Sequence, residues 1–462
     1  MITIRDPRSG FNRREFLGIG SLALGGLALP SVLQAAGAQP STQLTTGKSV
    51  VFLFLHGGPP QIETFDPKMS APEGIRSVTG EVATVLPGIT FGGAFQRLAR
   101  LADKFTVIRS YRPGDGNHDL KPLVHKDLLN AHLGSVYSWV AGMNDPSTGV
   151  PRNVMLFPSA VLPKAQAQFV PSGNFLSTGA LGSAYAPVVP GGTGEFQANL
   201  QLRLQRDRLD DRRRLLAELD DIKRDCDPSG SMDSLDHHQV QALDMLLRGV
   251  DKAFDLSRED QRLVERYDTA GLVRLDNIPK CTADKWYADN VKSLGKLLLY
   301  ARRLCEAGCG FVTVTTNFVW DMHADGDDAG VAGSQPYTCA PLDHALSAFI
   351  EDVEARGLSE QILLVVCGEM GRTPKVNAKG GRDHWGNLGP LLLYGGGLNM
   401  GQVIGRSTPN AGDPATEPIA MKQLIATIMR TILDVPAVRT ARNVPDTVAR
   451  AIAEGEPIRE LF

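Results

Sequence analysis

This sequence lacks a strong charge of either sign. Its 462 residues carry 48 Lys and Arg against 51 Asp and Glu, so the formal net charge is −3. A nucleic-acid-binding protein needs a basic surface to meet the phosphate backbone. The one arginine-rich run, residues 203–214, is interleaved with acidic residues, which is typical of a solvated helix face. We therefore expect no nucleic-acid partner.

Several sequence patterns that mark known enzyme classes are also missing. The chain has no Gly-x-Ser-x-Gly elbow, no Walker loop and no dinucleotide fingerprint in a strand–turn–helix context, and these absences argue against the enzymes that use them. Beyond the N-terminus, no apolar run approaches the roughly 18 to 20 residues that a membrane-spanning helix needs. What remains is an ordinary globular composition, 42% hydrophobic and 21% charged, with enough length for a large core.

The N-terminus carries a targeting pattern. Arg13 and Arg14 precede a weakly apolar stretch rich in Gly and Ala, residues 17–33, and residues 36–38 have the small-x-small pattern of a cleavage site. We expect residues 1–38 to be a twin-arginine signal peptide that exports the protein to the periplasm, with no membrane span left after cleavage. The alternative is an uncleaved anchor, which Pro30 and the low hydrophobicity disfavour.

Cysteine is scarce, with six residues in the chain. Cys305 and Cys309 lie four apart on an expected helix, and Cys367 ends an expected buried strand. We expect most of the cysteines to be small core residues, and a bridge between Cys226 and Cys281 stays open.

Apolar runs alternate with helical patterns in the rest of the chain. The runs at residues 49–55, 105–108, 311–316 and 362–367 are typical of buried parallel strands. Residues 94–102 predict a short helix. Residues 294–305 and 342–353 repeat apolar positions at helical spacing, and a glycine follows each segment. The sequence therefore predicts an α/β fold with a mostly parallel sheet and helices on both faces.

Residues of about 196–275 differ from their surroundings. They are charged, follow a helical period and contain no strand candidate. We expect a helical insertion there, within a single domain that spans residues 39–462. A weaker option is that this insertion is an arm that binds a protein partner.

Carboxylates and imidazoles follow several of the expected strands. Because ligands of open α/β sheets bind beyond the carboxyl ends of the strands, we expect these side chains to converge on a divalent metal. Zinc, manganese, iron, calcium and magnesium all stay open. The alternatives are a surface turn at 321–323 and a simple ion pair between Glu369 and Arg372. The candidate ligands are His56, Asp66, Asp321, His323, Asp325, Glu369, Asp383 and His384.

Three residues are candidates for catalysis. Ser110 ends the second expected strand, and its hydroxyl could attack if a metal lowered its pKa, although a structural serine is the alternative. His118 is expected to open the next helix. Arg372, or Arg382, would bind an anion. His118, His125 and His132 recur every seven residues, and for the last two we expect a polar helix surface.

Ordered motifs through most of the chain resemble one exported bacterial family, known as domain of unknown function 1501. This family is grouped with the alkaline phosphatase and sulfatase superfamily. The resemblance implies a three-layer sandwich in which strand ends supply Asp and His to one or two metals, and a Ser, Thr or formylglycine attacks phosphate or sulfate. The motifs are residues 55–59 with 63–68, 109–110 with 117–118, 253–257, 301–308, 320–323, 368–374 and 381–385.

On that resemblance, Asp321 and His323 correspond to the first metal pair, Glu369 to the late strand-end carboxylate and His384 to the final histidine. The chain departs from the superfamily where Glu369-Met370 stands in place of Asp-His, in the shorter spacing of Asp321 and His323, and in lacking a hydroxyl or Cys that clearly occupies the nucleophile turn. Residues 226–230 lack the arginine of the sulfatase nucleophile pattern and are rejected as a nucleophile. The implied function is a metal-dependent hydrolase of phosphate or sulfate esters, acting on an anionic small molecule or glycan. The alternative is a non-catalytic exported module that binds a glycan, an anion or a protein partner.

Overall fold

The computed structural model describes residues 44–191, 241–242, 245, 248 and 250–462. Contacts separate residues 1–43 from a compact unit, Leu44–Phe462, and the account below concerns that unit. The expected signal peptide and most of the expected helical insertion lie outside the described residues, as does Cys226. In the part that is described, no helix has the length and hydrophobicity that crossing a membrane requires.

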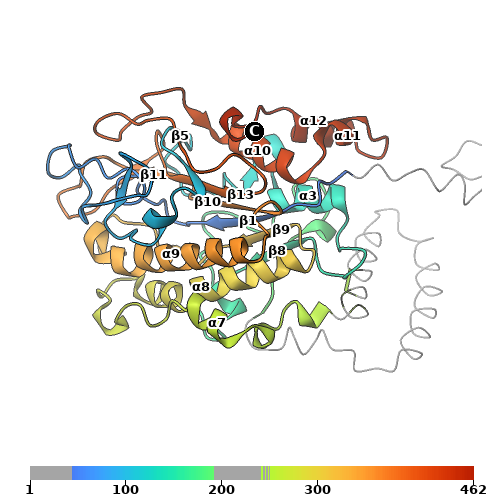
Figure 1. Ribbon diagram of the computed structural model, residues 1–462, viewed down its shortest axis with the longest axis horizontal. Coiled ribbons are helices and arrows are strands. Elements are labelled where there is room, and N and C mark those ends of the chain that lie inside the picture. Colours follow the sequence, from blue (N-terminus) through green and yellow to red (C-terminus); the bar gives the residue numbers. More distant parts are fainter. Residues whose placement is uncertain (1–43, 192–240, 243–244, 246–247, 249) are drawn as a thin grey trace, which may run out of the picture. The chain divides into compact units, whose positions relative to one another are not determined.

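A seven-stranded sheet forms the centre of the unit (Figure 1). Within it, β13 alone runs antiparallel to both of its neighbours, and the other pairings are parallel. The expected mostly parallel sheet is confirmed, and the four predicted strands are all present. The strand order is β14 (Val403–Ile404), β4 (Phe105–Ile108), β13 (Leu391–Gly395), β10 (Ile362–Cys367), β1 (Ser49–Phe54), β9 (Phe311–Val314) and β8 (Asn153–Leu156).

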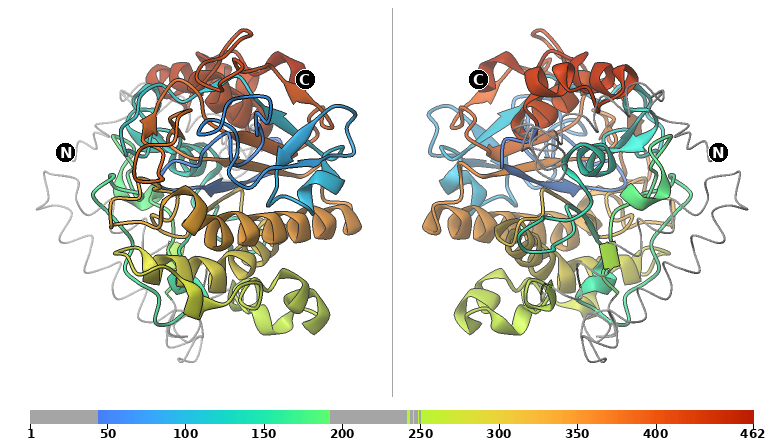
Figure 2. Two further views of the ribbon diagram at one scale, coloured as in Figure 1. Left: turned by 90° about the vertical axis from the view of Figure 1, so that its left-hand side faces the viewer. Right: turned by 90° about the vertical axis from the view of Figure 1, so that its right-hand side faces the viewer.

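Helices cover both faces of this sheet, which confirms the three-layer arrangement (Figures 1 and 2). Successive side chains of β1 point to opposite faces. Val51 and Leu53 belong to the core shared with one helical layer, whereas Val50 and Phe52 belong to the core shared with the other. A strand buried on both sides must be apolar throughout, which is why the runs are continuous. One layer contains α8 (Asp284–Glu306) and α9 (Gly330–Ala355), and the other contains α3 (Leu133–Ala141), α10 (Met421–Ile432), α11 (Val435–Thr440) and α12 (Asp446–Ala453).

Small two-stranded sheets carry the loops around the main sheet. Of these, β11 with β12 matters most below, because it holds Arg372 opposite His384. The pairs are β11 (Gly371–Arg372) with β12 (His384–Trp385), β15 (Ile419–Ala420) with β5 (Tyr111–Arg112), β2 (Glu81–Ala83) with β3 (Thr90–Gly92), and β6 (Val124–His125) with β7 (Ala131–His132).

Several local predictions were wrong. The segment 94–102 forms only a 3-10 turn, η2 (Leu98–Leu101). Cys309 lies beyond the end of α8, so it does not share a helix with Cys305. His125 and His132 lie in short strands rather than on a helix. His132 is fully buried, and its Nδ1 accepts from the backbone N of Gly134 at 3.0 Å, capping α3. A helix cap needs a fixed acceptor, and the seven-residue spacing does not reveal that role.

The described end of the expected insertion is helical. It contains η6 (Val250–Lys252), η7 (Leu256–Arg258), α7 (Gln261–Tyr267) and η8 (Leu275–Asn277), and no strand occurs between residues 250 and 277. The buried Arg302 of α8 ties this segment to α9. Its guanidinium lies 2.8 Å from Asp352 and 3.0 Å from Glu259. Removing one partner from such a buried group leaves the others uncompensated.

Candidate metal centre

Three adjacent strands, β10, β1 and β9, end at one edge of the sheet, and the loops beyond them form the centre. β1 is followed by His56 and Gly57, β9 by the loop that carries Asp321, and β10 by Glu369. The chains approach so closely that a Cβ on Gly57 would lie 2.4 Å from the backbone N of Asp321. Gly57 also has a φ of +116°. Both facts require glycine at this position.

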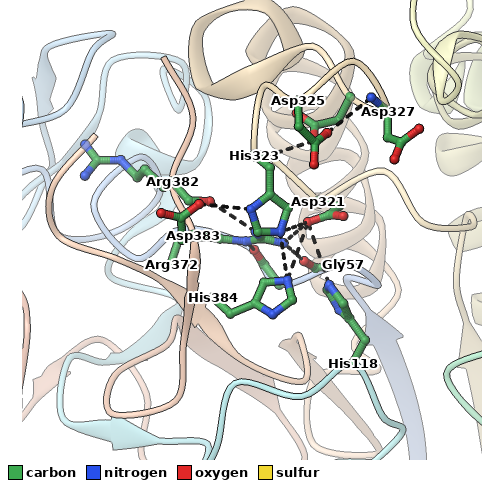
Figure 3. Close-up of polar contacts among 12 residues, drawn as sticks. Gly57, His118, Asp321, His323, Asp325, Asp327, Arg372, Arg382, Asp383 and His384 are labelled. Carbon is green, nitrogen blue, oxygen red and sulfur yellow. Dashed lines mark hydrogen bonds and ion pairs between the residues drawn. The ribbon is translucent and has the colours of Figure 1, made fainter. Parts of the chain in front are cut away.

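Four side chains from distant parts of the sequence meet at this edge: His118, Asp321, His323 and His384 (Figure 3). One ligand atom from each lies within 4.8 Å of all the others. Nε2 of His323 is 2.8 Å from Nε2 of His384 and 3.1 Å from Oδ1 of Asp321. The same Asp321 oxygen is 4.0 Å from Nε2 of His384 and 3.7 Å from Nε2 of His118. The structure thus brings together three of the expected ligands, and adds His118.

Glu369 stands behind His118 rather than among the four. Its carboxylate is fully buried, accepts from the backbone N of Gly57 at 3.0 Å, and lies 2.8 Å from Nδ1 of His118. Because an ionised carboxylate only accepts, Nδ1 of His118 carries the hydrogen. The other ring nitrogen of His118, Nε2, faces Asp321, and this buried nitrogen has no hydrogen-bond partner among the described residues.

Asp383 has the same relation to His323. Its Oδ1 lies 3.1 Å from Nδ1 of His323 and accepts from Nδ2 of Asn377 at 3.1 Å. Nε2 of His323 is thereby directed toward Asp321 and His384. A histidine that binds a metal commonly donates its second N–H to a carboxylate in this way.

The charges at this edge are strongly coupled. Burial opposes ionisation of Asp321, but His118, His323 and the charge of Arg372 outweigh it and hold the pKa of Asp321 well below its usual range. Burial lowers the pKa of His118, yet Asp321 and Glu369 reverse the effect and the net shift is upward. The bond to Asp321 raises the pKa of His323. Burial and the charge of Arg372 lower the pKa of His384 to about 4, so this imidazole is neutral near pH 7.

These residues fit a divalent metal. Three imidazole nitrogens and one carboxylate oxygen are a donor set used by zinc, iron and manganese sites. The unpartnered Nε2 of His118 and the two carboxylates that orient His118 and His323 are what such a site requires. In the described part of the chain this is the one group of three or more such ligands.

Three other expected site residues lie elsewhere. His56 is enclosed by Phe54 and Phe318, and its Nε2 lies 2.9 Å from Oγ of Ser172. Asp66 forms ion pairs with Arg109 at 3.6 Å and Lys68 at 3.2 Å. Asp325, in the loop after Asp321, instead accepts from the backbone of Asp327 at 3.2 Å.

Ser110 is not at the cluster. It is buried against Gly405, after the β14 strand at the far side of the sheet. β4 is separated from β10 by β13, which at about 4.8 Å per strand puts Ser110 roughly 10 Å from the end of β10. The prediction of a nucleophile there is not supported by this placement. His118 lies in a loop and opens no helix.

The two arginines do not present their charges to a ligand. Arg372 is fully buried and donates to the carbonyl of Gly58 at 2.9 Å and to Oδ1 of Asp321 at 2.5 Å. Its acidic partner is thus Asp321, not Glu369. Arg382 is also fully buried, with Glu63 at 2.8 Å, and its guanidinium points away from the cluster in Figure 3. Both therefore hold the loops together rather than bind an anion.

A cavity of about 400 Å³ adjoins the cluster. His118 and Asp321 line it together with Ser172 and the aromatic side chains of Phe169, Trp286 and Phe318. Sequence reasoning missed these four residues. Phe169 and Ser172 come from one loop, Phe318 from another and Trp286 from α8, so no sequence motif connects them.

Comparisons with known proteins give weak structural likenesses. The chain is similar to a phosphonate monoester hydrolase from Silicibacter pomeroyi, with 10% identity, 89% of this chain and 76% of that chain covered, and a TM-score of 0.36. It is also similar to the lipoteichoic acid synthase LtaP from Listeria monocytogenes, with 8% identity, 87% of this chain and 76% of that chain covered, and a TM-score of 0.31. A third similar structure is the PsFucS1 sulfatase from Pseudoalteromonas sp., with 11% identity, 98% of this chain and 80% of that chain covered, and a TM-score of 0.36. TM-scores this low support no argument about activity.

The comparison with curated proteins found no match. The comparison with protein families matches residues 47–462 to a family described as a protein of unknown function, DUF1501. That match covers nearly all of the compact unit, including every residue of the candidate centre. The chain therefore belongs to the DUF1501 family.

Proposed function

We propose that this protein is an exported, metal-dependent hydrolase of phosphate or sulfate esters. The observation that carries the proposal is the convergence of His118, Asp321, His323 and His384 at the strand-end edge of a parallel sheet. In open α/β folds this edge is where ligands bind. Export is proposed from the twin-arginine pattern at Arg13 and Arg14.

The four clustered side chains would hold the metal. Their three imidazoles favour zinc, manganese or iron over calcium or magnesium, which prefer oxygen ligands. When bound, the metal would supply Lewis-acid polarisation of the ester oxygen. Glu369 and Asp383 fix the tautomers of His118 and His323, so that both Nε2 atoms face inward.

Water, rather than a serine, is the expected attacking group. Ser172 lines the adjoining cavity, and its Oγ is within hydrogen-bonding distance of His56. Burial lowers the pKa of His56 to about 4. A base with so low a pKa is poorly matched to proton transfer near pH 7, so His56 would activate Ser172 weakly.

Metal analysis of the exported, purified protein together with turnover of aryl phosphates and sulfates tests the proposal. We expect close to one metal per chain, and loss of both metal and turnover in His384→Ala. His344→Ala is the matched control, because His344 lies in α9 and contacts the carbonyl of Arg266 instead. A protein with no metal and no turnover would rule the proposal out.

One observation favours the alternative of a non-catalytic binding module. Arg372 donates to Asp321 and lies 3.2 Å from Nε2 of His323, so it shares the atoms that a metal would use. Under this alternative, the protein would bind an anion or glycan without turning over any ester. Metal-independent binding that is lost in His323→Ala would support it, because His323 belongs to the cluster and its pKa is raised.

A further inference from the structure

The cavity beside the metal centre has its own chemical character. It has a volume of about 400 Å³, within the range of small-molecule sites. We propose that it binds a cationic ammonium group carried by the leaving group of the ester substrate. Its role in catalysis rests on the proposed function, whereas its binding of a cation does not.

Aromatic side chains form the wall of this cavity. The rings of Phe169 and Phe318 are stacked, with centroids 4.5 Å apart. Trp286 stands edge-on to both, with its centroid 5.8 Å from Phe169 and 6.4 Å from Phe318. Phe318 also contacts the ring of His118 at 4.6 Å, so the aromatic wall reaches the metal centre. Aromatic faces attract ammonium groups through their quadrupoles.

Three carboxylates line the cavity, and its one basic lining residue in the described part of the chain is His118, whose pKa is raised. Asp321, Asp327 and Asp328 line it, and no Lys or Arg is among its described lining residues. Asp328 is occupied by backbone N–H groups, including those of His323 and Gly330. Asp327 is exposed and accepts from the hydroxyl of Thr282 at 2.9 Å, so it is the carboxylate best placed to meet a ligand.

This combination selects among possible ligands. A neutral sugar or an apolar aryl group could pack on the aromatic wall but would gain nothing from the carboxylates. An anion would be repelled by them and would need the metal end, where His118 and Asp321 lie. An ammonium group gains from both the aromatic rings and Asp327. The substrate would therefore bind with its ester group at the cluster and its ammonium group among Trp286, Phe169 and Asp327.

Binding to the full-length protein tests this directly by calorimetry. The probes are choline and 3,3-dimethylbutan-1-ol, which has the same shape without the charge. We expect choline to bind at least about 10-fold more tightly, and Asp327→Asn to reduce that preference severalfold. Asp325→Asn is the matched control, because Asp325 is a nearby exposed carboxylate that does not line the cavity. Trp286→Leu should also reduce the preference for choline.

Turnover measurements separate the proposal of a cation site from the proposal that the protein is a hydrolase. The pair of substrates is choline phosphate and 3,3-dimethylbutyl phosphate, and we expect a higher kcat/KM for the first. Preferential choline binding without turnover of these esters or of aryl phosphates and sulfates would support the cation site and refute the hydrolase. Equal binding of the charged and neutral alcohols, or an unchanged preference in Asp327→Asn, would overturn the cation site and leave the hydrolase unaffected.

Discussion

Glu369→Gln should weaken metal binding without abolishing it. Glu369 does not stand among the four clustered ligands, but it fixes His118 through the contact of 2.8 Å to Nδ1. Glutamine keeps the size of the side chain and one acceptor oxygen, and removes the negative charge. Because the site is fully buried, no water can replace the lost oxygen.

The size of the effect follows from the role of Glu369. Removing a carboxylate that orients a metal-bound histidine costs about 10- to 100-fold in metal affinity, which corresponds to about 1.4–2.7 kcal/mol. Asp383 orients His323 in the same way, but its side chain is 56% exposed. Solvent screens an exposed charge, so Asp383→Asn should cost less than Glu369→Gln.

Competition with a chromophoric zinc chelator measures these affinities on metal-free protein, and circular dichroism checks that each variant is folded. His384→Ala serves as the reference for loss of a direct ligand. If Glu369→Gln loses as much affinity as His384→Ala, then Glu369 is itself a ligand. If it loses none, or less than Asp383→Asn, the orienting role is refuted.

Three further predictions concern the stability of the fold and the close approach of Gly57 to the backbone of Asp321. Burial lowers the pKa of His132 to about 3. Between pH 6.5 and 3 the unfolded chain therefore binds a proton that the native chain does not, so the free energy of unfolding should fall as the pH falls, and His132→Asn should flatten this slope in urea denaturation. Arg302→Met should cost about 3–5 kcal/mol in the same assay because it leaves buried carboxylates uncompensated, whereas Arg266→Met, which breaks an exposed pair, should cost at most about 1 kcal/mol. Gly57→Ala should abolish metal binding by displacing the Asp321 loop, whereas Gly74→Ala, at a similar positive φ in open space, should leave it intact.

A specific result would contradict each of these three predictions. A pH slope unchanged in His132→Asn would mean that other groups cause it. Equal destabilisation by the Arg302 and Arg266 variants would show that burial does not decide the strength of these ion pairs. Full metal affinity in Gly57→Ala would show that the 2.4 Å approach to the Asp321 backbone is not needed to position the cluster.

The main strands could be predicted because each is buried on both faces. A continuous apolar run such as residues 362–367 has few other uses in a soluble chain, and it forms β10 as expected. Helix ends were less predictable: the apolar pattern at 342–353 lies inside α9, which begins at Gly330 and contains Pro336 and Pro341. Packing against the sheet overrides local propensity there.

The sequence by itself determined the sheet, its two helical layers and the sheet edge that Asp321 and Glu369 follow, because parallel strands bring their carboxyl ends to the same side. Only the tertiary structure decided which of the acids face the cluster and which stand behind it. Glu369 and Asp321 both follow buried strands in the sequence, yet one orients His118 and the other faces it. The position of a residue along the chain fixes which strand end it follows. The residue that its side chain contacts is set by loops that come from parts of the chain hundreds of positions away.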